Sequence, residues 1–229
     1  MSEKIQTLFS EIAPRYDRIN TLLSLTNDKR WRRQAVALLK TDPYQRVLDL
    51  CAGTLEMSRA LLQVNPRVKI DAVDFSEPML KVGLNKIPFG QRERVRLHCK
   101  DVTTLDFPNK KFDGIMCAYG LRNINDNEAI LKNLKRMLRS HGKLVILDFY
   151  APEKIFPKLF QMSYARFMIP TIGRLVSGNK AAYNHLKDSM RAYYTPTAYR
   201  LLLSELGFCN VTVKPQMGGI SYLISGEIP

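Results

Sequence analysis

Residues 46–54 read RVLDLCAGT, an apolar strand pattern that runs into a loop of small residues. From this stretch onward, short apolar runs of strand length alternate with segments of helical periodicity. Such alternation is typical of parallel βαβ units with helices on both faces of one sheet. We expect strands at 47–50, 68–73, 95–99, 112–117 and 143–149, and helices at 57–64, 78–84 and 128–138. The sequence thus predicts a mostly parallel α/β fold.

Both ends of the chain extend this core. Two further strand patterns, 209–214 and 220–225, flank a Gln-Met-Gly-Gly turn and predict an antiparallel hairpin at the edge of a seven-stranded sheet. We expect a single domain. Its parts are a helical N-terminal cap (1–45), a cofactor-binding βαβ core (46–150), a helical insertion (151–200) and a C-terminal helix end with the hairpin (201–229).

The cap contains two helical patterns. The first ends at Pro14, and the second begins at Asn27 or Asp28, either of which can cap a helix. The second helix carries Trp31 on its apolar side. Its predicted basic face comprises Lys29, Arg30, Arg32 and Arg33.

The charge balance of the chain is strongly basic. Thirty-five lysines and arginines against 21 aspartates and glutamates give a formal net charge of +14. Such a surface attracts anions, which include nucleic acid, acidic ligands and the anionic leaflet of a membrane. Charge alone does not choose among these partners.

Targeting and metal-binding patterns are missing from the sequence. The N-terminus carries Glu3 and Glu11 without an apolar h-region, and no run of 18 apolar residues occurs, so we expect neither a secretory signal nor a membrane span. The four cysteines and three histidines show no metal-ligand spacing. The sequence therefore predicts a cytoplasmic protein, in a reducing compartment, without a structural metal.

Residues 152–196 interrupt the alternation of strands and helices. This stretch is rich in aromatic residues and holds seven lysines and arginines but only two acids, Glu153 and Asp188. Aromatic residues combined with positive charge favour an anionic interface. We expect a helical substrate lid that makes peripheral contact with an anionic membrane. Packing of the aromatic stripe into the core remains the alternative.

Small and acidic residues follow the first three predicted strands, where open α/β sheets bind ligands. Gly53 lies in the first loop, and Asp74, 21 residues later, ends the second strand, where a carboxylate can accept both hydroxyls of a ribose. A turn or capping role before Ser76 is the alternative for Asp74. After the third strand, Asp101 and Val102 could contact an adenine edge. Because the glycine-rich dinucleotide motif is absent, a nucleoside cofactor without phosphates fits best, and S-adenosylmethionine is the commonest of these.

Over essentially its whole length, the chain resembles the ubiquinone/menaquinone biosynthesis C-methyltransferase family of the UbiE/MenG type. Four stretches carry the resemblance: YDRIN at 16–20 with Leu23-Ser24 and WRR at 31–33; VLD at 47–49 through Gly53-Thr54; FD at 112–113 through GLRNI at 120–124; and LKRML at 134–138 with Gly142. The first loop would suit any class I methyltransferase. The YDxxN…S…WRR and GLRN patterns are more specific.

This resemblance implies the class I S-adenosylmethionine-dependent methyltransferase fold and methyl transfer to a ring carbon of a demethylated prenyl quinol. The implied catalytic residues are Arg122, which would stabilise a phenolate and hold a water that takes the proton, Asn123, which would orient the quinol, and Tyr16, which would close the pocket. The alternatives are a helix-capping role or an ion pair with Asp126 for Arg122, and a core aromatic with a satisfied hydroxyl for Tyr16. The implied cofactor residues are Asp49, Gly53, Thr54, Asp74, Asp101 and Val102. The acceptor implies a place at the inner face of the membrane, and a homodimer remains open.

The chain departs from the family pattern at several positions. Leu55 stands where a small residue is expected, so we expect its side chain to narrow the space for the methionine portion of the cofactor. The other departures are Cys51, Ala52, Glu56, Asp28, Asn179 and Ala118.

Three functions remain after this comparison of patterns. A quinol C-methyltransferase leads. A methyltransferase acting on RNA or on another small molecule comes next because of the net charge, but no added RNA module or Asn-Pro-Pro-Tyr type motif is present, so we expect no nucleic-acid partner. A cofactor-binding module without catalysis is the third.

Overall fold

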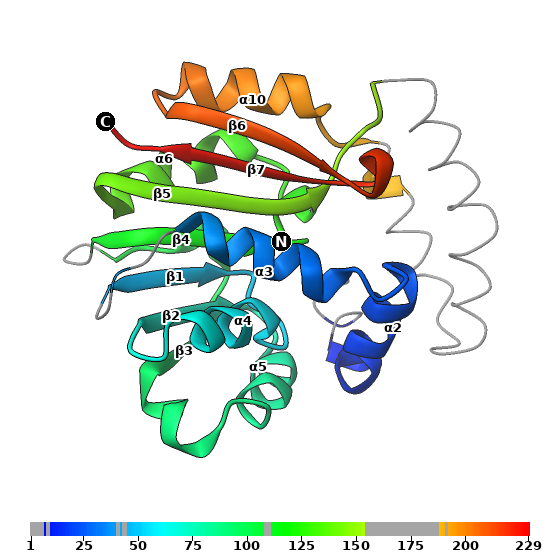
Figure 1. Ribbon diagram of the computed structural model, residues 1–229, viewed down its shortest axis with the longest axis vertical. Coiled ribbons are helices and arrows are strands. Elements are labelled where there is room, and N and C mark those ends of the chain that lie inside the picture. Colours follow the sequence, from blue (N-terminus) through cyan, green and yellow to red (C-terminus); the bar gives the residue numbers. More distant parts are fainter. Residues whose placement is uncertain are drawn as a thin grey trace.

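The computed structural model describes residues 7, 10–39, 42, 45–107, 111–153, 188–190 and 192–229. Within them, one seven-stranded sheet has the order β3-β2-β1-β4-β5-β7-β6 (Figure 1). The strands are β1 (Arg46–Leu50), β2 (Lys69–Asp74), β3 (Val95–Cys99), β4 (Phe112–Ala118), β5 (Leu138–Phe149), β6 (Cys209–Gln216) and β7 (Ser221–Glu227). Strands β1 to β5 pair in parallel, and β7 runs antiparallel to both β5 and β6. The predicted parallel core with an antiparallel edge hairpin is confirmed.

Helices cover both faces of this sheet, as predicted. They are α2 (Tyr16–Leu23), α3 (Asp28–Leu39), α4 (Glu56–Val64), α5 (Glu77–Leu84), α6 (Asn127–Met137) and α10 (Pro196–Glu205). Short 3-10 turns connect them: η1 (Ala13–Arg15), η2 (Phe89–Arg94), η3 (Val102–Thr104), η4 (Leu121–Asn123) and η7 (Met217–Gly219). Helices α3, α4 and α5 pack on one face, whereas α6 and α10 pack on the other. Figure 1 shows α3 running across the strands of its face.

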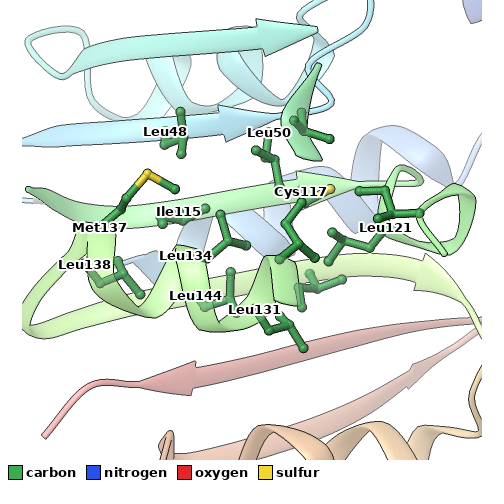
Figure 2. Close-up of a cluster of buried hydrophobic side chains, with 14 of the residues drawn as sticks. Leu48, Leu50, Ile115, Cys117, Leu121, Leu131, Leu134, Met137, Leu138 and Leu144 are labelled. Atoms are coloured by element: carbon green, nitrogen blue, oxygen red, sulfur yellow. The ribbon is translucent and has the colours of Figure 1, made fainter. Parts of the chain in front are cut away.

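Two buried clusters result because successive side chains of a strand point to opposite faces. In β4, Met116 joins the cluster under α3 and α4, whereas Ile115 and Cys117 join the cluster under α6. Figure 2 shows this second cluster, in which Leu131 and Leu134 of α6 lie over the strands. The strands are apolar on both faces, which is why they appear in the sequence as continuous runs.

The first part of β5 differs from the prediction. Helix α6 ends at Met137 and β5 begins at Leu138, five residues before the predicted start at Lys143. Leu138 pairs with Phe112, and the register then shifts before Gly114 pairs with Lys143. His141 takes a φ of 59° within this irregular stretch. The helical pattern therefore continued in the sequence beyond the point where the chain turns into the sheet.

The N-terminal cap is helical, but it is more divided than predicted. Residues 10–12 are helical, Pro14 lies in η1, and the separate helix α2 follows. Helix α3 begins at Asp28, and the backbone N–H of Asp28 donates to the Ser24 hydroxyl at 3.1 Å. The predicted basic face was wrong for Arg32, which is only 6% exposed. Its burial places a positive charge inside the protein.

Most of the predicted lid, residues 154–187 and 191, lies outside the described residues. Next to it, Tyr193 packs against Tyr150 and Tyr199, and its hydroxyl donates to Asn127 Oδ1 at 2.8 Å. For Tyr193, the alternative of packing into the core is therefore correct. The proposed boundaries between the parts of the domain stay a prediction. None of the helices in the described ranges is both long and apolar enough to cross a membrane.

Candidate functional site

A cavity of about 30 Å³ lies where the carboxyl ends of β1, β2 and β4 meet. Strand β1 has β2 as its neighbour on one side and β4 on the other. The strands that follow β1 in the chain are therefore added first on one side of it and then on the opposite side. This is the switch point at which open α/β sheets bind ligands. The cavity is lined by Tyr16, Cys51, Gly53, Asp74, Phe75, Met79, Ala118, Tyr119, Gly120 and Asn123.

Asp74 joins the ends of β1 and β2. Its Oδ2 accepts a hydrogen bond from the backbone N–H of Gly53 at 2.8 Å, and its Oδ1 accepts one from Ser76 at 2.9 Å. Gly53 has a φ of 51°, and a Cβ atom at this position would meet nothing within 4 Å, so open space lies beside the loop. Burial raises the pKa of Asp74, although these backbone donors oppose the shift. Asp74 therefore does have the turn role that was the alternative interpretation of the sequence. Its carboxylate oxygens can still accept further hydrogen bonds, because each oxygen can accept more than one.

Asp49 lies behind the cavity rather than on its wall. Its Oδ2 accepts hydrogen bonds from the Ser58 hydroxyl at 2.6 Å and from the Ser58 backbone N–H at 3.1 Å. Its Oδ1 is buried without a partner. Burial raises the pKa of Asp49 to about 7, and the Ser58 bonds offset part of this shift. In this structure Asp49 anchors the start of α4.

Thr54 is also turned away from the cavity wall. Its hydroxyl donates to Asp17 Oδ1 at 2.6 Å. The Lys86 ammonium group pairs with Asp17, lies 3.2 Å from Glu56 Oε1 and contacts the Thr54 carbonyl oxygen at 3.5 Å. We call Asp17, Thr54, Glu56 and Lys86 the Lys86 network. It ties α2, and with it Tyr16, to the loop after β1. Lys86 was not predicted from the sequence, although Asp17 lies in the YDRIN stretch.

The expectation for Leu55 was wrong. Leu55 has a φ of 59°, and its side chain is 0% exposed. It packs against Gly83 of α5, where an added Cβ atom would lie 2.5 Å from Leu55 Cγ. The side chain therefore fills a gap in the core that a glycine leaves open, and it does not line the cavity.

Asp101 and Val102 belong to a neighbouring region. Asp101 Oδ1 accepts a hydrogen bond from the Thr103 backbone N–H at 2.9 Å and so caps η3. Val102 is 1% exposed and borders a second, larger groove of about 650 Å³ between η3 and α6. Asn123 borders both the cavity and this groove, so it is the residue that the two share.

Arg122 is buried and ion-paired. Its Nη1 lies 2.7 Å from Asp148 Oδ1 and 2.8 Å from the Tyr119 carbonyl oxygen, whereas its Nε has no partner. The alternative of an ion pair with Asp126 was wrong, because Asp126 caps α6 through Ala129. Burial alone would lower the pKa of Arg122, but the Asp148 carboxylate, together with Tyr16 and Tyr119, more than offsets this and raises it. The guanidinium therefore stays charged.

A second buried guanidinium, that of Arg32, lies near the same cavity. Its Cζ lies 5.3 Å from the Tyr119 ring centroid, and its Nε lies 4.0 Å from Asp28 Oδ2. Burial raises the pKa of the Tyr16 hydroxyl, while an Asn20 hydrogen bond and the charges of Arg122 and Arg32 oppose the shift. Both arginines thus favour negative charge on a phenol at the Tyr16 position. No sequence pattern indicated the partner Asp148, and Arg32 was predicted to lie at the surface.

Comparisons with known proteins agree with this geometry. The sequence model described as the ubiE/COQ5 methyltransferase family matches residues 1–226. A protein of Thermus thermophilus named demethylmenaquinone methyltransferase is 39% identical over 222 residues, which cover 97% of this chain and 100% of that protein. A Geobacter sulfurreducens protein named ubiquinone/menaquinone biosynthesis C-methyltransferase UbiE is 35% identical over 98% of this chain and 88% of that protein.

Solved structures show the same fold. Magnesium protoporphyrin IX methyltransferase from Synechocystis, with bound S-adenosylhomocysteine, has a TM-score of 0.67 at 17% identity, covering 98% of both chains. Human N-acetylserotonin methyltransferase, in complex with S-adenosylmethionine, has a TM-score of 0.66 at 17% identity, covering 99% of this chain and 59% of that one. The expected class I methyltransferase fold is confirmed.

Proposed function

Because this chain belongs to the ubiE/COQ5 methyltransferase family, we propose that it methylates a ring carbon of a demethylated prenyl quinol. The family makes the chain an S-adenosylmethionine-dependent methyltransferase of quinone biosynthesis. The acceptor follows from the names of its full-length relatives, of which the Thermus thermophilus protein acts in the menaquinone series by name. We propose demethylmenaquinol as the acceptor, with the benzoquinol of the ubiquinone series as the second candidate.

The residues that line the cavity fit this cofactor. Asp74 lines the cavity with acceptor capacity left for ribose hydroxyls, and the open space beside Gly53 suits the close approach of a ligand to the backbone. Bound there, S-adenosylmethionine supplies a methyl group that its sulfonium already activates. Tyr16 is the residue of the N-terminal cap that lines this cavity.

The protein must promote ionisation of the acceptor, because a phenol has a pKa of about 10 and is largely protonated at neutral pH. A quinol ring carbon becomes nucleophilic when the neighbouring hydroxyl loses its proton. The observation that carries the proposal is the pair of buried guanidinium groups, Arg32 and Arg122. Burial raises the pKa of the Tyr16 hydroxyl, and both positive charges oppose that rise. Preorganised charge of this kind is worth most in a water-poor site.

The roles of individual residues follow from the positive charge of Arg32 and Arg122. Arg122 acts on the phenolate through its charge while Asp148 fixes its position. Asn123, which borders the cavity, orients the quinol, and a water near Arg122 takes the proton. The alignment of donor and acceptor contributes the remainder of the catalysis.

The experiment is a methyl-transfer assay with labelled S-adenosylmethionine and membranes that contain demethylated quinol. We expect a labelled quinol whose mass has increased by one methylene unit. Label found in RNA, with none in the lipid fraction, would favour the alternative acceptor. Cofactor binding without transfer to either would indicate a binding module.

We further propose that the protein takes its substrate from the inner, anionic face of the membrane. The net charge of +14 supports this, and so do two exposed leucines at the end of α2, Leu22 at 46% and Leu25 at 48%. Cosedimentation with anionic and neutral vesicles checks it. We expect salt-sensitive binding to the anionic vesicles, weakened when Lys154, Lys158 and Arg166 of the predicted lid are replaced by glutamine. Equal binding to both kinds of vesicle, or none, would contradict it.

A further inference from the structure

Two cysteines meet at the wall of the cavity, and the proposed methyl transfer uses neither. Strands β1 and β4 are parallel neighbours in which Leu50 pairs with Cys117, and Cys51 follows Leu50. An extended residue at position 51 would point to the face of the sheet opposite Leu50. Cys51 instead has a φ of 54°, and its side chain packs with the cluster that contains Cys117. The left-handed turn thus brings the two thiols to the same face.

The two sulfur atoms converge on Gly120. A Cβ atom at Gly120 would lie 2.6 Å from Cys51 Sγ and 3.1 Å from Cys117 Sγ, so glycine is what lets both thiols occupy this corner. The neighbouring Cys117 thiol, together with burial, raises the pKa of Cys51. Figure 2 shows Cys117 near the carboxyl end of β4. The cysteines therefore form a contacting pair.

The two thiols differ in their access to the cavity. Cys117 is fully buried, whereas Cys51 is half-buried and lines the cavity beside Gly53 and Asp74. Because Cys51 and not Cys117 lines the cavity, an oxidant bound there meets Cys51 first, with Cys117 behind it as the resolving thiol. Since the thiolate is the reactive form, the raised pKa slows background oxidation at neutral pH and makes the reaction faster as the pH rises.

We propose that Cys51 and Cys117 are an oxidation site whose closure to a disulfide weakens cofactor binding. The oxidant is a quinone, the oxidised form of the methyl acceptor, and this part rests on the proposed function. The two thiols lose two protons and two electrons as the S–S bond forms, and the quinone takes up both to become a quinol. No other reactant is required.

Formation of the disulfide moves the loop after β1, which is proposed to bind the cofactor. A disulfide holds its sulfur atoms about 2.05 Å apart, so its formation pulls the Cys51 turn toward β4. Gly53 follows two residues later, and its N–H lies 2.8 Å from Asp74. Displacement of this bond disturbs the carboxylate that is proposed to hold the ribose. An oxidised quinone pool thereby lowers methylation, which needs the quinol.

Oxidation is tested in a chain carrying Cys99→Ser and Cys209→Ser, in which Cys51 and Cys117 are the remaining thiols. Diamide shows whether the pair closes. Duroquinone, whose ring carbons are all substituted, shows whether a quinone closes it without thiol addition. We expect the loss of two hydrogens in the mass spectrum and a cross-linked Cys51–Cys117 peptide with both reagents, formed faster at alkaline pH. Absence of the cross-link with diamide would overturn the site, and absence with duroquinone alone would overturn the quinone as oxidant.

Calorimetric titration with S-adenosylmethionine, without any acceptor, measures the consequence. We expect affinity about tenfold lower after oxidation, as for the loss of a charged hydrogen bond, with recovery on adding dithiothreitol. The matched control adds Cys117→Ala to the same chain, and its affinity stays the same before and after oxidant. Unchanged affinity in the cross-linked protein would overturn the effect on binding. Methyl transfer by the reduced protein is assayed separately, so its failure would refute the acceptor and not the thiol pair.

Discussion

The β2 side and the β4 side of the cavity are held by different kinds of contact. On the β2 side, backbone N–H groups of Gly53 and Ser76 hold the Asp74 carboxylate. On the β4 side, side chains hold one another, because the Arg122 guanidinium pairs with Asp148 and its Cζ lies 5.4 Å from the Phe149 ring centroid. The first side is an acceptor for a ligand, and the second is a source of positive charge.

This difference predicts how each side responds to substitution. Of the two backbone donors to Asp74, Gly53 lies at the cavity, where water can replace the carboxylate. A buried Asp148 that loses Arg122 keeps an uncompensated charge, because its side chain is 0% exposed. We therefore expect cofactor binding to be lost from the β2 side without unfolding, and catalysis and stability to change together on the β4 side.

The largest effect is expected for Arg122→Ala. We expect turnover to fall by about 10²–10³, as for the loss of a donor to a developing oxyanion, and the free energy of unfolding to fall by about 3–5 kcal/mol. Arg122→Lys keeps the charge but loses the planar fork, so turnover falls there too. Single-turnover kinetics and urea unfolding measure the two effects.

A double variant separates them. Arg122→Met with Asp148→Leu removes both buried charges, so we expect stability to return while turnover stays low. Normal turnover in Arg122→Ala would show that this guanidinium has no part in the chemistry.

Asp74→Ala tests the β2 side. Loss of the Asp74 carboxylate removes two charge-assisted hydrogen bonds to the ribose, each worth about 1.5–3 kcal/mol. We therefore expect the affinity for S-adenosylmethionine to fall by about a hundredfold or more, while the protein stays folded. Calorimetric titration measures the affinity, and circular dichroism the fold. Glu77→Ala, at an exposed acid on α5, is the matched control. If both variants bound equally well, Asp74 would not hold the ribose.

Asp49 gives a pH-dependent prediction. Its pKa is about 7 in the folded protein and 3.8 as its ordinary value, so the folded state binds a proton that the unfolded state releases between these pH values. Asp49 therefore lowers the free energy of unfolding progressively as the pH rises from about 4 to 7, and this loss is constant above pH 7. We expect Asp49→Asn to be the more stable protein by up to about 4 kcal/mol at neutral pH, from a pKa shift of about three units, and to lose this advantage toward pH 4. Urea unfolding across this range checks the slope. An advantage of equal size at both ends of the range would show that burial does not hold the proton.

The Lys86 network gives the smallest expected effect. Lys86→Met leaves Asp17 and Glu56 without their shared cation, and because these groups are partly exposed we expect a loss of about 1 kcal/mol in stability. Faster hydrogen exchange in α2 is expected as well, since the network ties that helix to the loop after β1. Lys81→Met, at an exposed lysine of α5, is the control and leaves α2 unchanged. Equal exchange in the two variants would show that the cap is held by other contacts.

The sequence by itself determined the order of strands and helices and part of the cavity. The alternation of apolar runs fixed the parallel core, because hydrophobic periodicity is a local property of the chain. The spacing of Gly53 and Asp74 predicted that the ends of β1 and β2 meet, and these residues are joined by a hydrogen bond. Asn123 and Tyr16 reach the same cavity from the GLRN and YDRIN stretches.

The tertiary structure decided which groups became partners across the sheet. Arg122 pairs with Asp148, 26 residues away, because β4 and β5 are neighbours, and no local pattern distinguishes Asp148 from the nearer Asp126. Leu55 turns into the core because Gly83 of another helix leaves room for it. Arg32 is buried because α3 lies across the sheet beside Tyr119. Burial and pairing depend on what the rest of the fold places next to a residue, whereas periodicity and spacing are written along the chain.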